Sequence, residues 1–367
     1  MTKEELFYTL ILQKVPKLGD ASAKKLIQKT GSPKAVFTEK KSTLMKIDGI
    51  GSFKLKDLYS KDFYTLAEDE IKFIESNDIS TTYFKDDKYP EKLKHCLDGP
   101  ILFFQKGAIN LNKKRIISIV GTRKVTTYGA KFCEQLIEEL SPLNPLIVSG
   151  FAYGVDIAAH KAALKNNLQT IGCLAHGLNQ IYPKIHQKYV KDVEYNGGFI
   201  TEFWSSDVFD RNNFLKRNRI IAGISEATIV IESAEKGGSL VTAELANSYN
   251  RDVFAVPGRV TDSQSQGCNN LIKTQRANLL TSAADLVYLL NWKLDDKKVK
   301  TIQKQLFIEL EEDEQIIYNY LKTQNKAHID DIAINCNMPI FKITTELLKL
   351  ELKGVVRPLP GKIFESC

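Results

Sequence analysis

Three short apolar runs in the middle of the chain each end at a glycine-containing turn and lead into a helical pattern. The runs are Ile116–Val120, Leu146–Ser149 and Thr228–Ile231. Continuous runs rich in β-branched residues are typical of strands that are buried on both faces of a parallel sheet. Strands that alternate with helices favour right-handed crossovers. The sequence therefore predicts an α/β fold with a doubly wound, Rossmann-like central sheet.

The glycine turns that follow these runs are expected at one edge of the sheet. Parallel strands end on the same side, and ligands of doubly wound sheets bind there. Glycine lets backbone amides approach an anion, and the first turn of a helix favours negative charge. None of the turns matches the G-x-G-x-x-G motif or a P-loop, so nicotinamide and ATP chemistry gain little support. We therefore predict a polyanion site at this edge.

A basic segment, Arg217-Asn218-Arg219, precedes the third run and could add bidentate phosphate contacts. We treat it as extended, so that Arg217 and Arg219 would point to opposite faces. The predicted binding residues are Gly121, Arg123, Gly150, Gly154, Arg217, Asn218, Arg219, Lys236, Gly237, Gly238, Ser239 and Thr242.

Several of these residues have structural alternatives. Arg123 and Arg217 could form ion pairs with a carboxylate such as Asp156. Asp156 and Asn218 are more typical of residues that hold loops by hydrogen bonds to the backbone. Lys236 could be a solvated loop lysine.

Two aromatic residues near the glycine turns each have two possible roles. Tyr153 and Phe214 could stack on nucleic-acid bases, or they could belong to the core. A single histidine on a predicted helix, His160, is more typical of a packing residue than of a general base.

Length and composition indicate an intracellular protein of several domains. A chain of 367 residues suggests about two or three domains. The six cysteines form no C-x-x-C pair, which argues for reduced thiols and against structural zinc. We expect a cytoplasmic protein without a signal peptide or a membrane-spanning segment. The net charge of +7 permits nucleic-acid binding through a local patch without requiring it.

The first 75 residues contain an internal duplication. Val15–Leu26 and Ile47–Leu58 align apolar on apolar, and Lys17 stands where the second copy has Gly49. The pattern resembles paired helix-hairpin-helix motifs, whose turn amides can contact phosphate. A helical bundle kept for protein contacts is the alternative.

The C-terminal part is predicted to be a separate winged helix. Residues 294–306 are polar enough for a linker. Helical patterns at 314–321, 329–334 and 340–352 precede a predicted β-hairpin at 354–364 within a domain spanning 307–367. The helix at 340–352 carries balanced charges, so contact with protein is favoured over contact with duplex DNA.

Taken together, these motifs resemble the DNA-processing protein A (DprA, or Smf) family over nearly the whole chain. The resemblance is most specific in the predicted central domain, residues 80–293. The segments that carry it are Ile119–Arg123, Ser149–Asp156, Arg217–Gly223, Gly237–Ala243 and Val256–Gly258.

Membership would imply a protein that binds and protects single-stranded DNA during natural transformation. It would also imply loading of the recombinase RecA onto that DNA and a homodimer formed through the central domain. It implies no catalysis, cofactor or metal.

An enzyme of the lysine-decarboxylase-like phosphoribohydrolase group is the alternative. Those enzymes carry a P-G-G-x-G-T-x-x-E signature, of which Gly237–Glu244 is an incomplete version without the proline. Release of a free base from a nucleoside monophosphate would favour this alternative. Tight oligonucleotide binding without such release would favour the DprA family.

Overall fold

The computed structural model describes residues 1–293, 310–359 and 362–366, which belong to two compact units. The first unit is Met1–Leu294 and the second is Asp295–Cys367. The predicted linker at 294–306 lies outside the described residues.

In the described part of the first unit, one sheet holds nine strands in the order β1-β2-β6-β5-β4-β3-β7-β8-β9. The strands are β1 (Ser80–Tyr83), β2 (Leu102–Lys106), β3 (Ile116–Val120), β4 (Leu146–Ser149), β5 (Thr170–Cys173), β6 (Gly197–Thr201), β7 (Ala227–Val230), β8 (Asp252–Ala255) and β9 (Asn278–Leu279). Strands β3 to β9 pair in parallel, whereas β1 and β2 are antiparallel additions beside β6. The predicted doubly wound sheet is confirmed.

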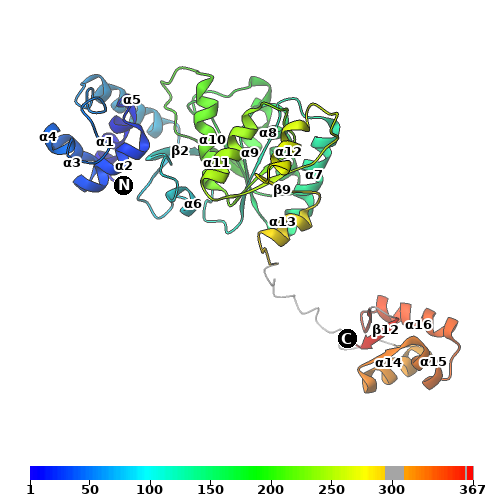
Figure 1. Cartoon of the computed structure of the whole chain (residues 1–367). Coiled ribbons are helices and arrows are strands. Elements are labelled where there is room, and N and C mark those ends of the chain that lie inside the picture. The colour runs from blue at the N-terminus through cyan, green and yellow to red at the C-terminus, as the bar shows by residue number, and fades with distance from the viewer. Residues whose placement is uncertain (294–309, 360–361, 367) are drawn as a thin grey trace. The chain divides into compact units, whose positions relative to one another are not determined.

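Helices cover both faces of this sheet (Figure 1). They are α6 (Glu91–Lys94), α7 (Thr127–Leu140), α8 (Val155–Lys165), α9 (Val190–Tyr195), α10 (Asn212–Ile224), α11 (Gly238–Ser248), α12 (Gln266–Lys273) and α13 (Ala283–Leu289), with short 3-10 turns η1 (Ser141–Leu143) and η2 (Lys184–Tyr189). Alternate residues of β3 enter different cores, because successive strand side chains point to opposite faces. Ile116 packs with α10, α11 and α12, whereas Ile117 packs with α7, α8 and α13.

The direction of chain winding changes between β3 and β7. The chain runs outward from β3 through β4 and β5 to β6, then returns so that β7 pairs with β3 on its other side. This is the switch point of the sheet, where the loops that leave the two adjacent strands separate and open a crevice.

The expectation that Arg217 and Arg219 lie on an extended segment is wrong. Both belong to α10, a 13-residue helix. Its buried face includes Asn213, Arg217 and Ile221, which are four residues apart. Polar side chains occupy core-facing positions, so the apolar period that normally reveals a helix is interrupted.

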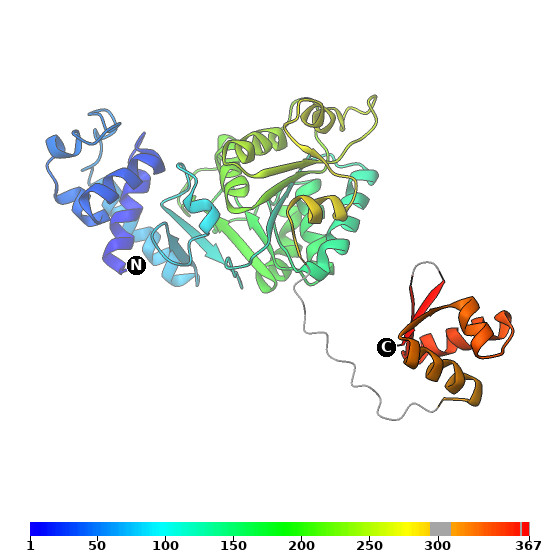
Figure 2. The same ribbon diagram turned by 60° about the horizontal axis from the view of Figure 1, so that its bottom comes forward.

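The N-terminal helices lie at the β1 and β2 end of the sheet (Figure 2). They are α1 (Lys3–Lys14), α2 (Gly19–Thr30), α3 (Pro33–Thr38), α4 (Lys41–Leu44) and α5 (Asp62–Ser76). Their core continues into the sheet through Leu102, Phe104 and Trp204. The predicted boundary between residues 75 and 80 remains a prediction.

The two copies of the N-terminal duplication share a backbone feature but differ in regularity. Lys17 has φ 65° and Gly49 has φ 76°, so the aligned positions are both left-handed. The first copy continues into α2, whereas residues 52–59 of the second copy form successive turns, with Leu55 and Leu58 buried. Assignment of the pair as helix-hairpin-helix motifs remains a prediction.

The second unit has the predicted winged-helix order. Its elements are α14 (Glu312–Gln324), β10 (Lys326–His328), α15 (Ile329–Asn335), α16 (Ile340–Leu352), β11 (Val356–Leu359) and β12 (Ile363–Ser366). Strands β11 and β12 pair antiparallel as the predicted hairpin, and β10 joins them through β12. Residues 360 and 361 lie outside the described residues.

None of the helices that the structure describes is long and apolar enough to cross a membrane.

Candidate nucleic-acid interface

A cavity of about 360 Å³ opens at the switch point, and we call it the switch-point cavity. Its walls come from the loop after β3, the start of α8, the N-terminal half of α10 and the loop between β7 and α11. Nine of the predicted residues line it: Gly121, Arg123, Arg217, Asn218, Lys236, Gly237, Gly238, Ser239 and Thr242. The fold therefore brings together residues that are far apart in sequence.

The first turn of α11 forms one wall of the cavity. Gly237 precedes the helix, and Gly238 is its first residue. The Ser239 hydroxyl bonds Ser233 Oγ at 3.0 Å, and the Asn218 side-chain amide donates to the Gly238 carbonyl at 3.3 Å. These bonds fix the start of the helix, whose terminal amides and dipole favour an anion.

Arg217 is buried at the inner end of the cavity, with 5% of its surface exposed. Its Nη1 donates to the Cys173 carbonyl, and its Nε donates to Asn218 Oδ1 at 3.4 Å. A Cβ placed on Gly150 would touch both the Asp156 carboxylate and the Arg217 guanidinium, so the two charged groups lie close together beside this glycine. They fill the space where a side chain at position 150 would lie, and such a side chain would collide with them.

Burial and the neighbouring charge shift the pKa values of Arg217 and Asp156 in opposite directions. Burial lowers the pKa of Arg217, and the nearby Asp156 charge opposes that shift. Burial raises the pKa of Asp156, against the effect of Arg217. Asp156 also accepts the Ala152 amide at 3.2 Å, so the prediction that it holds a loop is confirmed.

Gly154 supports the cavity from outside its lining. Its φ is 77°, a conformation that favours glycine, and a Cβ there would collide with the backbone of Thr122 and Arg123. A larger residue would push the Arg123 loop away from α8.

Cationic side chains at the cavity mouth are exposed. Arg123 and Lys236 lie there as predicted, and Arg211 joins them from the N-cap position of α10. The Arg123 guanidinium lies 5.1 Å from the Phe214 ring centre. Arg211 was not among the predicted residues, because its place at the cavity depends on where α10 begins.

His160 is fully buried below the Gly150 turn. One ring nitrogen lies 2.5 Å from the Gly150 carbonyl oxygen and the other lies 2.7 Å from Thr170 Oγ1. Burial lowers its pKa to about 4. The prediction of a packing residue is confirmed.

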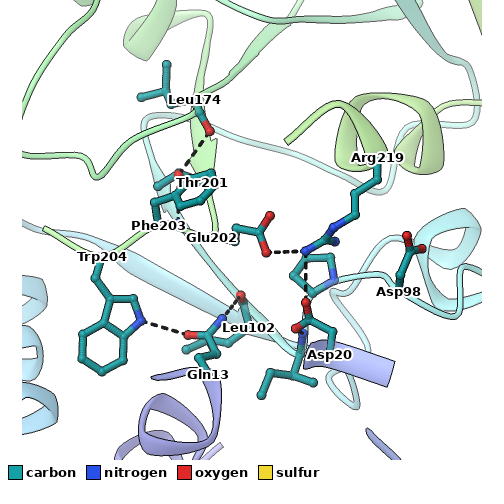
Figure 3. Close-up of polar contacts among 12 residues, drawn as sticks. Gln13, Asp20, Asp98, Leu102, Leu174, Thr201, Glu202, Phe203, Trp204 and Arg219 are labelled. Carbon is teal, nitrogen blue, oxygen red and sulfur yellow. Dashed lines mark hydrogen bonds and ion pairs between the residues drawn. The ribbon is translucent and has the colours of Figure 1, made fainter. Parts of the chain in front are cut away.

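Arg219 lies apart from this cavity. It contacts the carboxylates of Asp20, at 3.0 Å, and Glu202, beside the N-terminal helices (Figure 3). Residues two apart on a helix differ by about 200° in direction, which explains why Arg217 and Arg219 separate.

Comparison with known proteins identifies the family. The family model described as DNA recombination-mediator protein A matches residues 80–291. The chain belongs to this family. The model described as DprA winged helix domain matches residues 305–362. The switch-point cavity falls entirely within the part of the chain that the first model matches.

Two relatives illustrate the match in sequence. DNA processing protein DprA of Streptococcus pneumoniae is 40% identical over 203 residues, which cover 55% of this chain and 71% of that protein. Protein Smf of Escherichia coli is 32% identical over 281 residues, which cover 74% of each protein.

Solved DprA structures show the same fold. The X-ray structure of DprA from Streptococcus pneumoniae superposes with a TM-score of 0.64 and 30% identity, covering 77% of this chain and 97% of that chain. DprA from Helicobacter pylori superposes with a TM-score of 0.53 and 28% identity, covering 58% of this chain and 95% of that chain. That structure gives insight into the single-stranded DNA binding mode of the Helicobacter pylori protein.

Proposed function

We propose that this protein binds single-stranded DNA by its phosphodiester backbone in the switch-point cavity. The observation that carries the proposal is the convergence of the α11 N-terminus, the buried Arg217 and the exposed Arg123, Arg211 and Lys236 on one cavity. Helix amides and guanidinium groups are the usual ligands of phosphate in proteins. The single-stranded DNA binding of the Helicobacter pylori relative supports the same assignment here.

The wider proposal is a non-enzymatic role in DNA recombination. We infer that the bound strand is protected and passed to the recombinase RecA, and that two copies associate through the central domain. Membership of the DNA recombination-mediator protein A family supports this role.

The phosphoribohydrolase alternative is not favoured. Its motif would make Glu244 the counterpart of the signature glutamate, but this side chain is 60% exposed and pairs with Arg276 at 3.5 Å. It is absent from the residues that line the switch-point cavity. The buried Asp156 is engaged by the Ala152 amide and by the charge of Arg217, which suits a structural carboxylate.

For the winged helix we propose contact with protein. Each of the α16 lysines is paired with a carboxylate: Lys342 with Asp313 at 2.7 Å, and Lys349 with Glu346 at 3.1 Å. Phe341 and Leu352 are 77% and 82% exposed on the same helix. An apolar surface with neutralised lysines is poorly suited to a phosphate backbone.

Fluorescence anisotropy with labelled oligonucleotides tests the proposed DNA binding. We expect a preference for single-stranded over duplex DNA, and a steep loss of affinity with salt because bound counterions are released. Arg123→Ala should reduce the slope of log affinity against log salt by about 0.7, the value for one phosphate contact in single strands. Arg217→Ala should weaken binding to all sequences alike.

Lys161→Ala, an exposed change on α8 outside the cavity, is the matched control. Thermal melts of each variant separate loss of binding from loss of folding. Unchanged affinity in both arginine variants would refute the site. Release of free base from nucleoside monophosphates would revive the enzyme alternative.

A further inference from the structure

A second and larger opening lies between the N-terminal helices and the central sheet. We call it the N-terminal groove; its volume is about 1010 Å³. One wall is the turn between α1 and α2, including Lys17 and Gly19. The other wall is the segment from Glu202 to Asn213, followed by Lys216 and Arg219 of α10. The two walls come from parts of the chain almost 200 residues apart, so the groove exists only because the N-terminal helices are docked.

Polar contacts among residues that line the groove hold its two walls together (Figure 3). Arg219 bonds Asp20 of α2 and Glu202 of the sheet segment. Gln13 of α1 donates to the Leu102 carbonyl at 2.7 Å and accepts the Trp204 indole N–H at 3.2 Å. The groove therefore has a defined width in the folded protein.

Cations within the groove balance part of the charge of the four carboxylates that line it. Asp20 and Glu202 share Arg219, and Lys14 pairs with Asp207. The Asp210 carboxylate accepts the Asn212 amide at 2.9 Å, a bond that holds the wall without removing the charge. After Arg219 and Lys14 are counted, the four acids leave two negative charges, fewer than the three exposed cations on the groove walls.

Three groove-lining cations are exposed: Lys17, Arg211 and Lys216. Among the residues that the structure describes, none of the three has a carboxylate within ion-pair distance. Lys17 lies near the Phe53 ring, 4.0 Å from its centre, which leaves its charge unneutralised. Unpaired cations on facing walls attract a polyanion that enters between them.

The groove continues into the switch-point cavity. Arg211 lines both openings. The ring of Phe209, a groove residue, lies 5.7 Å from that of Phe214, which lines the cavity. A strand that leaves the cavity past Arg211 would therefore enter the groove directly, with aromatic surface beside its bases.

We propose that the N-terminal groove binds the next phosphodiesters of the same single strand, with Lys17 and Lys216 as its phosphate contacts. This proposal rests on the proposed function of the switch-point cavity. The N-terminal helices are then part of the DNA-binding surface. Arg219 is a positioning residue, because its contacts hold the two walls of the groove at a fixed separation.

The test compares oligonucleotides of two lengths with a double variant, Lys17→Gly with Lys216→Ala, in the full chain. Glycine suits the left-handed backbone at position 17, and the second copy of the duplication has Gly49 there. An oligonucleotide of about six nucleotides is meant to fill the cavity alone, and one of about twenty to reach the groove. The control pair is Lys29→Ala with Lys161→Ala, two exposed lysines that line neither opening.

We expect the double variant to bind the long oligonucleotide about tenfold more weakly at physiological salt, with a salt slope reduced by about 1.4 for two phosphate contacts. Its affinity for the short one should match that of the unmodified protein. Lys216→Ala alone should show about half the change in slope.

Equal affinity of the double variant and the unmodified protein for the long oligonucleotide would overturn the groove, as would an equal loss at both lengths. The first result leaves DNA binding in the cavity untouched. The second would mean that the two lysines affect any bound oligonucleotide, the short one in the cavity included, and do not form a separate groove site. If the unmodified protein binds neither oligonucleotide, the proposed function fails as well, so the two failures are distinguishable.

Discussion

Arg217 and Arg219 are two residues apart on α10 and lie in different environments. Arg217 reaches the cavity, where the nearby Asp156 carboxylate partly balances its charge beside Gly150. Arg219 is enclosed by Asp20 and Glu202 at the junction with the N-terminal helices. We propose that the arginine at position 217 binds phosphate, whereas the one at position 219 balances internal charge; helical geometry separates the two directions.

At the residue scale, Gly150→Ala should disturb the site without altering its charge. The added Cβ would press on the Asp156 carboxylate and the Arg217 guanidinium, both of which are held by other bonds. We expect a loss of about 1–3 kcal/mol in the free energy of unfolding, the usual range for overpacking, together with weaker DNA binding. Thermal melts and anisotropy measure the two effects.

Gly51→Ala is the control for that experiment, since open space surrounds this glycine. Equal melting temperatures and affinities for Gly150→Ala and the unmodified protein would show that the packing around Gly150 is less restrictive than its geometry implies.

Glu202 should give the protein a pH-dependent stability. Burial raises the pKa of Glu202 from 4.5 to about 7, with a further increase from the Asp20 charge and against the opposing effect of Arg219. The folded state therefore holds the Glu202 proton more tightly than the unfolded chain does. The stabilisation is present below pH 4.5 and is lost as the pH rises through about 7.

The measurement is the free energy of unfolding of the unmodified protein minus that of Glu202→Gln, at several pH values. This difference should fall by roughly 1–3 kcal/mol between pH 5 and pH 8. The difference between the two proteins is needed because His160 also makes stability depend on pH. Its lowered pKa contributes stability that is lost as the pH falls from 6.5 to about 4, and this contribution cancels when the two proteins are compared. A difference that stays constant across this range would contradict the assignment.

The glycine turns of the site could be predicted from the sequence, but the directions in which its arginine side chains point could not. The turns at Gly121, Gly150 and Gly237 follow buried strands that are visible in the sequence. The contribution of Arg211 and the removal of Arg219 from the site depend on the boundaries and rotation of α10. The boundaries and rotation of α10 could not be inferred from the sequence, because the polar Asn213 and Arg217 occupy buried positions and interrupt its apolar pattern.

At the scale of elements, α10 links the switch-point cavity, the N-terminal groove and the core of the sheet. Its first residues line both openings, its middle carries the two arginines, and Ile220 and Ile224 pack under the sheet. Strands β3, β4 and β7 were predicted to within one residue at each end, because continuous apolar runs mark them. Strand β9 contains two exposed residues and gave no comparable signal.

Arg219→Ala should loosen the N-terminal helices. Removing the guanidinium leaves the carboxylates of Asp20 and Glu202 buried together, and breaking such a pair costs about 3–5 kcal/mol. We expect a lower melting temperature and faster proteolysis within residues 1–80, whereas short oligonucleotides that occupy only the cavity should bind as before. Arg123→Ala should give the reverse result, with normal stability and weaker binding. Proteolysis of Arg219→Ala at the rate of the unmodified protein would contradict this role.

At the scale of the whole molecule, the chain separates into two units, each with its own core. The winged helix packs around Ile317, Ile343 and Leu347, independently of the cores in the first unit. The winged-helix order of the second unit was predicted from sequence, because its helical patterns and its hairpin lie within a short local span. The division of the first unit into a helical module and a central domain stays a prediction.

A protein that ends at Lys293 should therefore fold and bind single-stranded DNA with an affinity within about twofold of the full chain, since domains with their own cores fold independently. Circular dichroism and anisotropy test this. A large loss of DNA affinity would show that the second unit contributes to binding and would contradict the protein-contact role proposed for it.

The order of the sheet also restricts how copies of this protein can meet. The outermost strands are β1, with four residues, and β9, with two. Long exposed edges recruit further strands and lead to aggregation, and a two-residue edge offers too few free amides and carbonyls for a neighbouring chain to extend the ladder at β9. At the β9 end, a dimer of the central domain should therefore form through side-chain packing between helices and loops, and concentrated protein should resist edge-to-edge polymerisation there.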